Sequence, residues 1–124
     1  MSSDMIILDY QNRNPIYCQI VQQIERYIAL GILKANDPLP SIRELASSLG
    51  INPNTVKKAY SELENKKLIV SISTKGCFVS SEVERAKEVK MEQEFENIKK
   101  SIAELQQLGL SVQDIKKKLE EICK

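Results

Sequence analysis

The segment Leu39-Pro-Ser-Ile-Arg-Glu-Leu-Ala-Ser-Ser-Leu-Gly-Ile-Asn-Pro-Asn-Thr-Val56 predicts two helices joined by a short turn. Ser41 and Glu44 have the spacing of a capping box, in which the serine oxygen accepts from the third helical amide and the glutamate reaches back. Gly50 is expected to end the first helix, and Asn52-Pro53 supplies a cap and a first-turn proline for the next. A turn of about three residues containing a glycine is typical of a helix-turn-helix unit.

The second of these helices, expected over residues 53–66, separates apolar from polar side chains at about 100° per residue. Its apolar side carries Val56, Ala59, Tyr60 and Leu63. Its opposite side carries Asn54, Lys57, Lys58 and Ser61, with Thr55 at the boundary. Amide, ammonium and hydroxyl groups are donors for phosphates and base edges. A solvated helix face without a function has the same composition, so this helix alone leaves both interpretations open.

The residues after this helix predict a β-hairpin. Residues 68–73 are rich in strand-forming side chains, residues 74–76 have the composition of a turn, and residues 77–79 return as a second strand. Two strands directly after a helix-turn-helix unit form a wing. The predicted fold class is therefore α+β, a winged helix-turn-helix domain.

Another amphipathic helix is expected before the quoted segment. Asn14-Pro15 predicts a cap and a first-turn proline, and isoleucine recurs at every fourth position from Ile16 to Ile28. Gly31 is expected to end this helix. The short apolar stretch at residues 5–8 either forms an edge strand or packs on the core.

The last third of the chain predicts two helices of a different kind. From Glu82 onward, apolar residues alternate at spacings of four and three in a narrow, heptad-like seam of Met91, Phe95, Ile98, Ile102 and Leu105. After Gly109, a second capping-box pattern opens a short helix whose apolar side carries Val112, Ile115, Leu119 and Ile122. Helices this short cannot bury such stripes alone. They need the winged domain, each other, or a second copy of the chain.

The composition of the 124 residues is that of a soluble globular protein, but it excludes several kinds of chemistry. Histidine is absent, which excludes Ser-His and Cys-His catalytic pairs and histidine-containing zinc sites. Cys18, Cys77 and Cys123 lack metal or disulfide spacing and are interpreted as packing residues, with redox sensing as the alternative. We therefore expect no metal site, no cofactor and no enzymatic activity.

Charge is unevenly distributed, although the net charge is only +1. Residues 34–81 carry seven basic and four acidic side chains, whereas residues 1–33 carry two and three, and residues 82–124 carry nine and ten. A basic middle between weakly acidic flanks favours a polyanionic partner. Because no apolar run is long enough to span a bilayer and no export signal is recognised, we expect a cytoplasmic protein without a membrane partner.

Five motifs carry a resemblance to a known family, and they are Pro15-Ile-Tyr-Cys-Gln19, Leu39-Pro-Ser-Ile-Arg-Glu-Leu-Ala46, Asn52-Pro-Asn-Thr-Val56, Ala59-Tyr-Ser-Glu-Leu-Glu64 and Gly76-Cys-Phe-Val79. Together they resemble the GntR family of bacterial transcription regulators, and more narrowly its YtrA subfamily, across about residues 10–80. The resemblance implies a DNA-binding domain over residues 1–81. Because the subfamily carries a small two-helix dimerisation segment, it also implies dimerisation through residues 82–124.

The resemblance implies DNA contacts at the starts of the two helices and at the wing tip, and these residues are Ser41, Arg43, Asn52, Asn54, Thr55, Lys57, Lys58, Lys75 and Gly76. The recognition helix is expected in the major groove and the wing tip in or beside the minor groove. Arg43 is expected on a base, guanine above all, or on a phosphate, and Lys58 on a phosphate. A local ion pair between Arg43 and Glu44 or Asp37 is the alternative.

Two positions depart from the family pattern. The wing turn lacks the arginines and paired glycines of many relatives, so its DNA contact rests on Lys75. Asn36 stands where a glycine is usual, which predicts an asparagine in the left-handed conformation. The residues expected to form the dimer are Phe95, Ile98, Ile102, Leu105, Ile115 and Leu119, with packing of the tail on its own winged domain as the alternative.

The function implied by the resemblance is that of a homodimeric, sequence-specific repressor. Its partners would be double-stranded DNA and a second copy of itself, and it would lie on the bacterial nucleoid when bound to DNA. The operator is expected to be near-palindromic, with half-sites about one helical turn apart. Similar proteins often control their own operon, including transporter genes. A winged-helix module for protein contacts, without DNA binding, is the alternative, and an effector cannot be recognised in the sequence.

Overall fold

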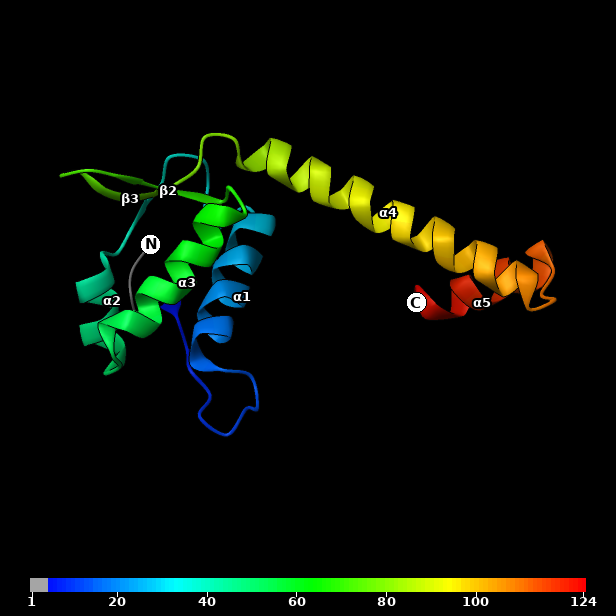
Figure 1. The fold of residues 1–124 in the computed structure, drawn as a ribbon, viewed down its shortest axis with the longest axis horizontal. Helices are drawn as coiled ribbons and strands as arrows, with labels where there is room; N and C mark the ends of the chain where they lie inside the picture. Colours follow the sequence, from blue (N-terminus) through cyan, green and yellow to red (C-terminus); the bar gives the residue numbers. More distant parts are fainter. Residues whose placement is uncertain (1–4) are drawn as a thin grey trace. The chain divides into compact units, whose positions relative to one another are not determined.

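A computed structural model describes residues 5–124, which divide into two compact units between Lys87 and Glu88 (Figure 1). The elements of the first unit are α1 (Ile16–Ala29), β1 (Pro38–Leu39), α2 (Ile42–Leu49), α3 (Pro53–Asn65), β2 (Ile69–Ile72) and β3 (Gly76–Val79). They are followed by α4 (Val83–Gln107) and α5 (Val112–Ile122). Three helices and a small sheet make the first unit a winged helix-turn-helix fold of the α+β class, as the sequence predicts.

The sheet is antiparallel, with strand order β1-β3-β2. β2 and β3 form the predicted wing hairpin, in which Ile69 pairs with Val79 and Ile72 with Gly76. β1 is a two-residue strand that pairs Leu39 with Cys77, and the sequence analysis did not predict it. By joining the segment before α2 to the wing, β1 fixes the start of the helix-turn-helix unit on the sheet.

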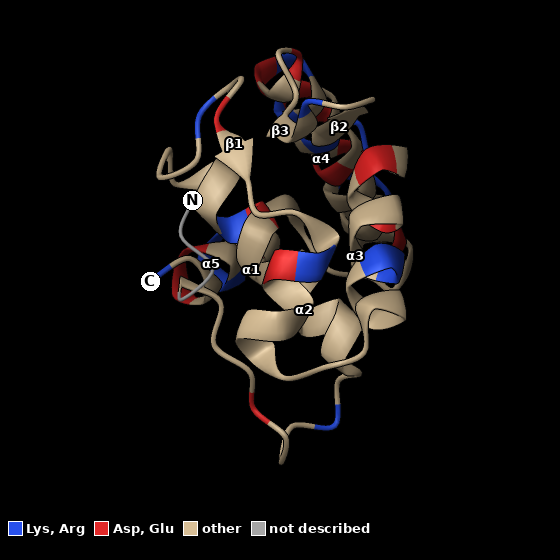
Figure 2. Ribbon diagram, turned by 90° about the vertical axis from the view of Figure 1, so that its left-hand side faces the viewer, with Lys and Arg blue, Asp and Glu red and all other residues tan. Residues whose placement is uncertain are grey.

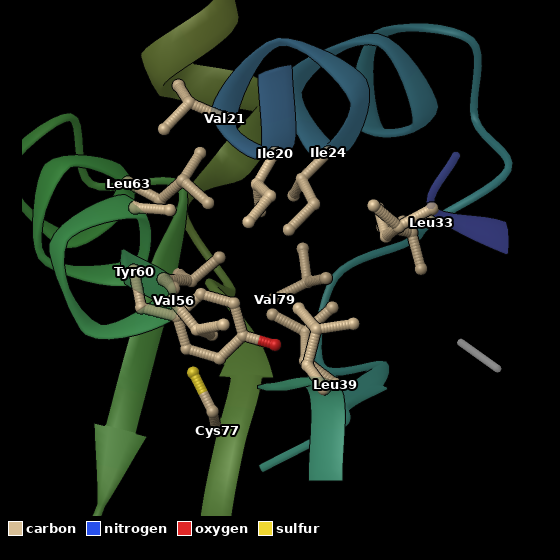
Figure 3. Packing of buried hydrophobic residues seen from close by; sticks show 14 of the residues in the cluster. Ile20, Val21, Ile24, Leu33, Leu39, Val56, Tyr60, Leu63, Cys77 and Val79 are labelled. Carbon is tan, nitrogen blue, oxygen red and sulfur yellow. The ribbon is translucent and has the colours of Figure 1, made fainter. Parts of the chain in front are cut away.

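The core of the first unit lies between the three helices and one face of the sheet (Figure 3). Helical periodicity brings Ile20 and Ile24 inward from α1, and Leu63 meets them from α3. Val79 contributes from β3, and each of these four side chains is at most 1% exposed. Cys77 is buried in the same cluster, in agreement with its interpretation as a packing residue.

Most of the predicted helix boundaries are confirmed. Gly50 ends α2 in the left-handed conformation with φ +67°, and the Ile51 amide donates to the Ala46 carbonyl at 3.0 Å. Three residues therefore separate α2 from α3, as expected for a helix-turn-helix. Asn36 has φ +70°, as predicted from its place in the turn. The predicted cap Asn14 is wrong by one position, because Pro15 occupies the N-cap of α1.

Two glutamines of α1 hold the segment that precedes the helix. The Gln19 side-chain oxygen accepts from the Asp9 amide at 2.9 Å, and its nitrogen donates to the Asp9 carbonyl at 3.0 Å. Gln23 makes the same pair of bonds with Ile7. Four helical residues advance about 6 Å and two extended residues about 6.6 Å. Glutamines four residues apart on α1 can therefore bond to residues two apart on the extended segment. Backbone groups of this segment are thus satisfied by side chains rather than by a sheet.

Tyr27 extends the same series by one more helical turn, because its hydroxyl donates to the Met5 carbonyl at 2.6 Å. Ile6 is buried in the core at 3% exposure, whereas Ile7 points outward at 74%. The sequence left two alternatives for residues 5–8, and the structure shows packing on the core rather than an edge strand.

The second unit contains the rest of α4 and the helix α5, and the chain reverses between them (Figure 1). Gly109, with φ +100°, lies in this reversal. The Ser111 hydroxyl then accepts from the Asp114 amide at 3.2 Å and caps α5, as the capping-box spacing predicts. The first residues of α4 belong to the first unit, where Val83 is buried and the Lys87 ammonium donates to the Ala29 carbonyl at 3.1 Å.

Candidate nucleic-acid interface

The two helices of the helix-turn-helix unit are held together by a buried tyrosine. The Tyr60 hydroxyl on α3 donates to the carbonyl of Pro40, just before α2, at 2.7 Å, and Tyr60 is only 2% exposed. Burial, more than the nearby charges of Cys77 and Glu44, raises the pKa of Tyr60, so its hydroxyl stays protonated and remains a donor. This bond fixes the start of α2 relative to the middle of α3.

The start of α2 presents Ser41 and Arg43. The Ser41 hydroxyl oxygen accepts from the Glu44 amide at 3.0 Å, which is half of the predicted capping box. Among residues 5–124, Glu44 makes no bond back to Ser41. The cap leaves the Ser41 proton available, and a helix start favours negative ligands because its amides are unpaired and its dipole is positive there.

Arg43 is exposed, and no acidic side chain of the described residues lies within 4.0 Å of its guanidinium. The local ion pair that the sequence left as an alternative is therefore not formed with Glu44 or Asp37. Asp37 instead accepts from the Lys34 amide at 2.8 Å and closes its own turn. Arg43 thus keeps all of its donors for an external partner.

The start of α3 is capped as predicted. The Asn52 side-chain oxygen accepts from the Asn54 amide at 2.8 Å, which leaves the Asn52 amide nitrogen as a donor. Asn54 and Lys57 are exposed, and Thr55 is half-buried. Within the described part of the chain, neither the Asn54 side chain nor the Lys57 ammonium has a partner. These groups lie at the beginning of α3, where an anion is also favoured by the helix dipole.

Lys58 differs from its neighbour Lys57, because its ammonium lies 4.0 Å from the centroid of the Tyr17 ring on α1. Tyr17 is half-buried and packs against the core cluster. Tyr17 lies in one of the five motifs that carry the family resemblance, but it was not predicted to belong to the site. No sequence signal marks this contact, because the two residues meet only when α1 packs on α3.

The wing tip is formed by residues 73–75, and the Lys75 amide donates to the Ile72 carbonyl at 3.0 Å. Thr74 has φ +70° and Gly76 has φ +110°. A left-handed conformation is costly for a β-branched residue, so strain is stored at this tip. Lys75 is exposed and makes no ion pair with any described residue.

Figure 2 shows basic residues on the ribbons of both α2 and α3. Not every lysine of this basic region is available to a ligand. Lys66 pairs with Glu25 of α1 at 2.5 Å, so it neutralises an acid of its own unit. Arg43, Lys57 and Lys75, three of the positions predicted to contact DNA, make no ion pair with any described residue. The same holds for Lys34 and Lys67, which were not predicted to contact DNA.

The six residues expected to form a dimer have different environments in the second unit. Phe95, Ile98 and Leu105 are exposed at 65%, 45% and 36%, whereas Ile115 is buried at 4%. Ile102 and Leu119 are half-buried. Part of the predicted seam is therefore covered in the single chain, and the rest forms an open apolar face on α4.

Other kinds of site are not found in the described residues. Residues 5–124 contain no group of three or more acidic or cysteine side chains arranged to hold a metal ion. None of their helices combines the length and apolar character needed to cross a bilayer. Of the three cysteines, all unpaired, Cys18 is half-buried. Cys123 is exposed, so its interpretation as a packing residue is wrong.

Comparisons with known proteins agree with this geometry. Residues 16–79 match the family model described as "Bacterial regulatory proteins, gntR family". The HTH-type transcriptional repressor YtrA of Bacillus subtilis (strain 168) is 37% identical over 119 residues, which cover 95% of this chain and 92% of that protein. The crystal structure of a transcriptional regulator from Oenococcus oeni is 38% identical with a TM-score of 0.71, covering 94% of this chain and 98% of its own.

Similar structures also include complexes with an operator. The crystal structure of AraR(DBD) in complex with operator ORR3 is 27% identical, with a TM-score of 0.52, and the match covers 60% of this chain and 89% of that one.

Proposed function

The chain belongs to the GntR family of bacterial regulatory proteins. We propose that it acts as a homodimeric repressor of its own operon and binds a near-palindromic operator. Proteins of this family are DNA-binding transcription regulators. Repression by this chain, its dimeric state and its operator are the content of the proposal. The relative most informative for it is the repressor YtrA, which this chain matches over nearly its whole length.

The observation that carries the proposal is the set of exposed donors at the two helix starts. Arg43 lies at the start of α2, and Asn54 and Lys57 lie at the start of α3. All three side chains are exposed and have no partner among the described residues. A bland solvated surface would also be exposed, but it would not gather bidentate donors at two helix N-termini of a helix-turn-helix.

We propose that some of these residues contact base edges and that others contact the DNA backbone. Arg43 and Asn54 have the planar, bidentate geometry that reads guanine and adenine, so they are proposed to contact base edges in the major groove. The remaining residues at the two helix starts, Ser41, Asn52, Thr55 and Lys57, are proposed to contact the same stretch of DNA. Lys58 and the wing residues Lys75 and Gly76 are proposed to contact the backbone or the minor groove.

Dimerisation is proposed to occur through the tail, residues 82–124, and DNA binding through residues 1–81. Phe95, Ile98 and Leu105 lie along α4 with heptad-like spacing, and their exposure in a single chain leaves an apolar face that water disfavours. A second copy would cover this face. A two-fold dimer would then present one recognition helix to each half-site, about one helical turn apart.

Fluorescence anisotropy tests this function. The full chain is titrated into the labelled duplex from immediately upstream of its own gene and, in parallel, into a scrambled duplex of equal length, at several salt concentrations. We expect the upstream duplex to bind about 10³-fold or more tightly than the scramble. Equal binding of both duplexes would contradict autoregulation, and binding of neither would favour a protein-interaction module.

A further inference from the structure

We propose that Tyr17 is a positioning residue for DNA binding, which holds the Lys58 ammonium in place for a backbone phosphate. The inference rests on the proposed function, because it needs α3 to lie against DNA. The observation behind it is the 4.0 Å distance between the Lys58 nitrogen and the centroid of the Tyr17 ring. A cation over the face of an aromatic ring is attracted by the ring quadrupole at this distance.

The ring is the fixed partner of the pair. Tyr17 is the second residue of α1, is half-buried and packs against the core cluster, and α1 packs along α3. Lys58, by contrast, is an exposed side chain with a flexible four-carbon stem. A lysine that is already held in one place loses less conformational entropy when it meets a phosphate. Lys57, one residue earlier, has no ring beneath it and offers a built-in comparison.

The Tyr17 ring and the acidic side chain of Glu62 are alternative partners for the Lys58 ammonium. Glu62 follows Lys58 by four residues on α3, which is the spacing of a helical ion pair. Lys58 nevertheless makes no ion pair with any described residue. Without the ring, we expect Lys58 to turn toward Glu62 and to have its charge partly neutralised before DNA arrives.

The state of the phenol is consistent with this role. The pKa of Tyr17 is raised, first by the neighbouring Cys18 and then by burial and by the charge of Glu62. The ring is therefore neutral at ordinary pH and brings no negative charge toward a phosphate.

The test measures salt-dependent binding of the full-length protein to two duplexes, the one upstream of its own gene and a mixed-sequence one. Removing the ammonium with Lys58→Met should make the negative slope of log K against log salt less steep by about one for each protomer bound, and therefore by about two for the dimer. Tyr17→Leu should weaken binding to both duplexes about two- to fivefold and should also make the negative slope less steep. Tyr17→Phe keeps the ring and should retain both values.

A double-mutant cycle separates positioning from general damage to the fold. In the Lys58→Met background, Tyr17→Leu should cause no further loss, because the side chain that it positions is gone. In the Lys57→Met background, the effects should simply add. A loss in Tyr17→Phe as large as in Tyr17→Leu would assign the effect to the hydroxyl and overturn the proposal. So would an undiminished effect of Tyr17→Leu in the Lys58→Met background.

One measurement needs no variant. Proton NMR of the free protein should show the ε-methylene protons of Lys58 shifted upfield relative to those of Lys57 by the ring current of Tyr17. Equal shifts for the two lysines would overturn the proposal even if Tyr17→Leu failed to fold. Failure of the wild-type chain to bind either duplex would instead contradict the proposed function.

Discussion

The two units of this chain differ in how completely they bury their apolar side chains. In the first unit, Ile20, Ile24, Leu45 and Leu63 are fully buried and share one core. In the second unit, Ile115 is buried, whereas Phe95 remains 65% exposed. The first unit therefore has a complete core within one chain, and the second has an apolar surface that one chain does not cover.

This difference predicts different dependence on protein concentration. A unit with its own core unfolds with a free energy that does not change on dilution, but a face covered by a second copy is stabilised by mass action. The four substitutions below test the comparison in order of expected effect.

The largest effect is expected in the core of the first unit. Leu63→Ala should lower the free energy of unfolding by about 2–5 kcal/mol, because it removes buried apolar contacts and leaves a cavity. Urea unfolding followed by circular dichroism gives this value. Ser61→Ala, on the exposed side of the same helix, serves as the control and should change stability by less than about 0.5 kcal/mol. A similarly small loss for Leu63→Ala would show that the core is not closed.

The second effect concerns association through the tail. Phe95→Glu places a charge on the open apolar face of α4 and should weaken dimerisation by about 2 kcal/mol or more. Sedimentation velocity at micromolar concentration measures the change. Asn97→Glu adds the same charge two residues away, outside the seam, and should leave the dimer intact. A wild-type chain that is already monomeric at this concentration would contradict the proposed dimer.

The third effect concerns operator affinity, which should depend on a cation of the first unit and not on one of the second. Arg43→Ala should weaken operator binding by about 1–3 kcal/mol and relax the preference at one base position. Anisotropy with a set of single-base operator variants measures both. Lys117→Ala removes one exposed cation of α5 and should leave the affinity nearly unchanged. Equal losses for the two variants would mean that charge alone, and not the helix-turn-helix, decides binding.

The smallest effect on stability is expected at the wing tip, where the first unit reverses the chain differently from the second. The tail uses Gly109 with φ +100°, whereas the wing has Thr74 with φ +70°. Thr74→Gly should therefore stabilise the protein by about 0.5–1 kcal/mol, since it relieves strain that a β-branched residue carries in this conformation. Thermal unfolding measures the change. Ser73→Gly, at a position without a positive φ, should not raise stability, and a gain there would point to general flexibility instead.

The parts of the fold that the sequence predicts well are set by local signals. Ser41, Asn52 and Ser111 each cap a helix through the amide two or three residues later, so short spacings were enough to place α2, α3 and α5. Gly50 and Asn36 have the left-handed conformation that their turns require. The error at Asn14 arose because a proline at the next position fits both the N-cap and the first turn.

The features that were not predicted depend on residues far apart in the chain. β1 exists because Leu39 meets Cys77 across the sheet, and two residues carry no periodicity. The contact of Lys58 with Tyr17 needs two packed helices. Every residue selected for DNA contact belongs to the first unit, but the part each plays stays a prediction until binding is measured.

The segment that lies along α1 also has a consequence for amide hydrogen exchange. The amides of Ile7 and Asp9 are bonded to glutamine side chains, whereas the amide of Leu8, between them, has no partner among the described residues. Exchange should therefore alternate along this stretch, slow at Ile7 and Asp9 and fast at Leu8. This alternation of slow and fast exchange, outside any strand or helix, would show whether the segment before α1 stays packed on that helix while the protein binds and releases its partners.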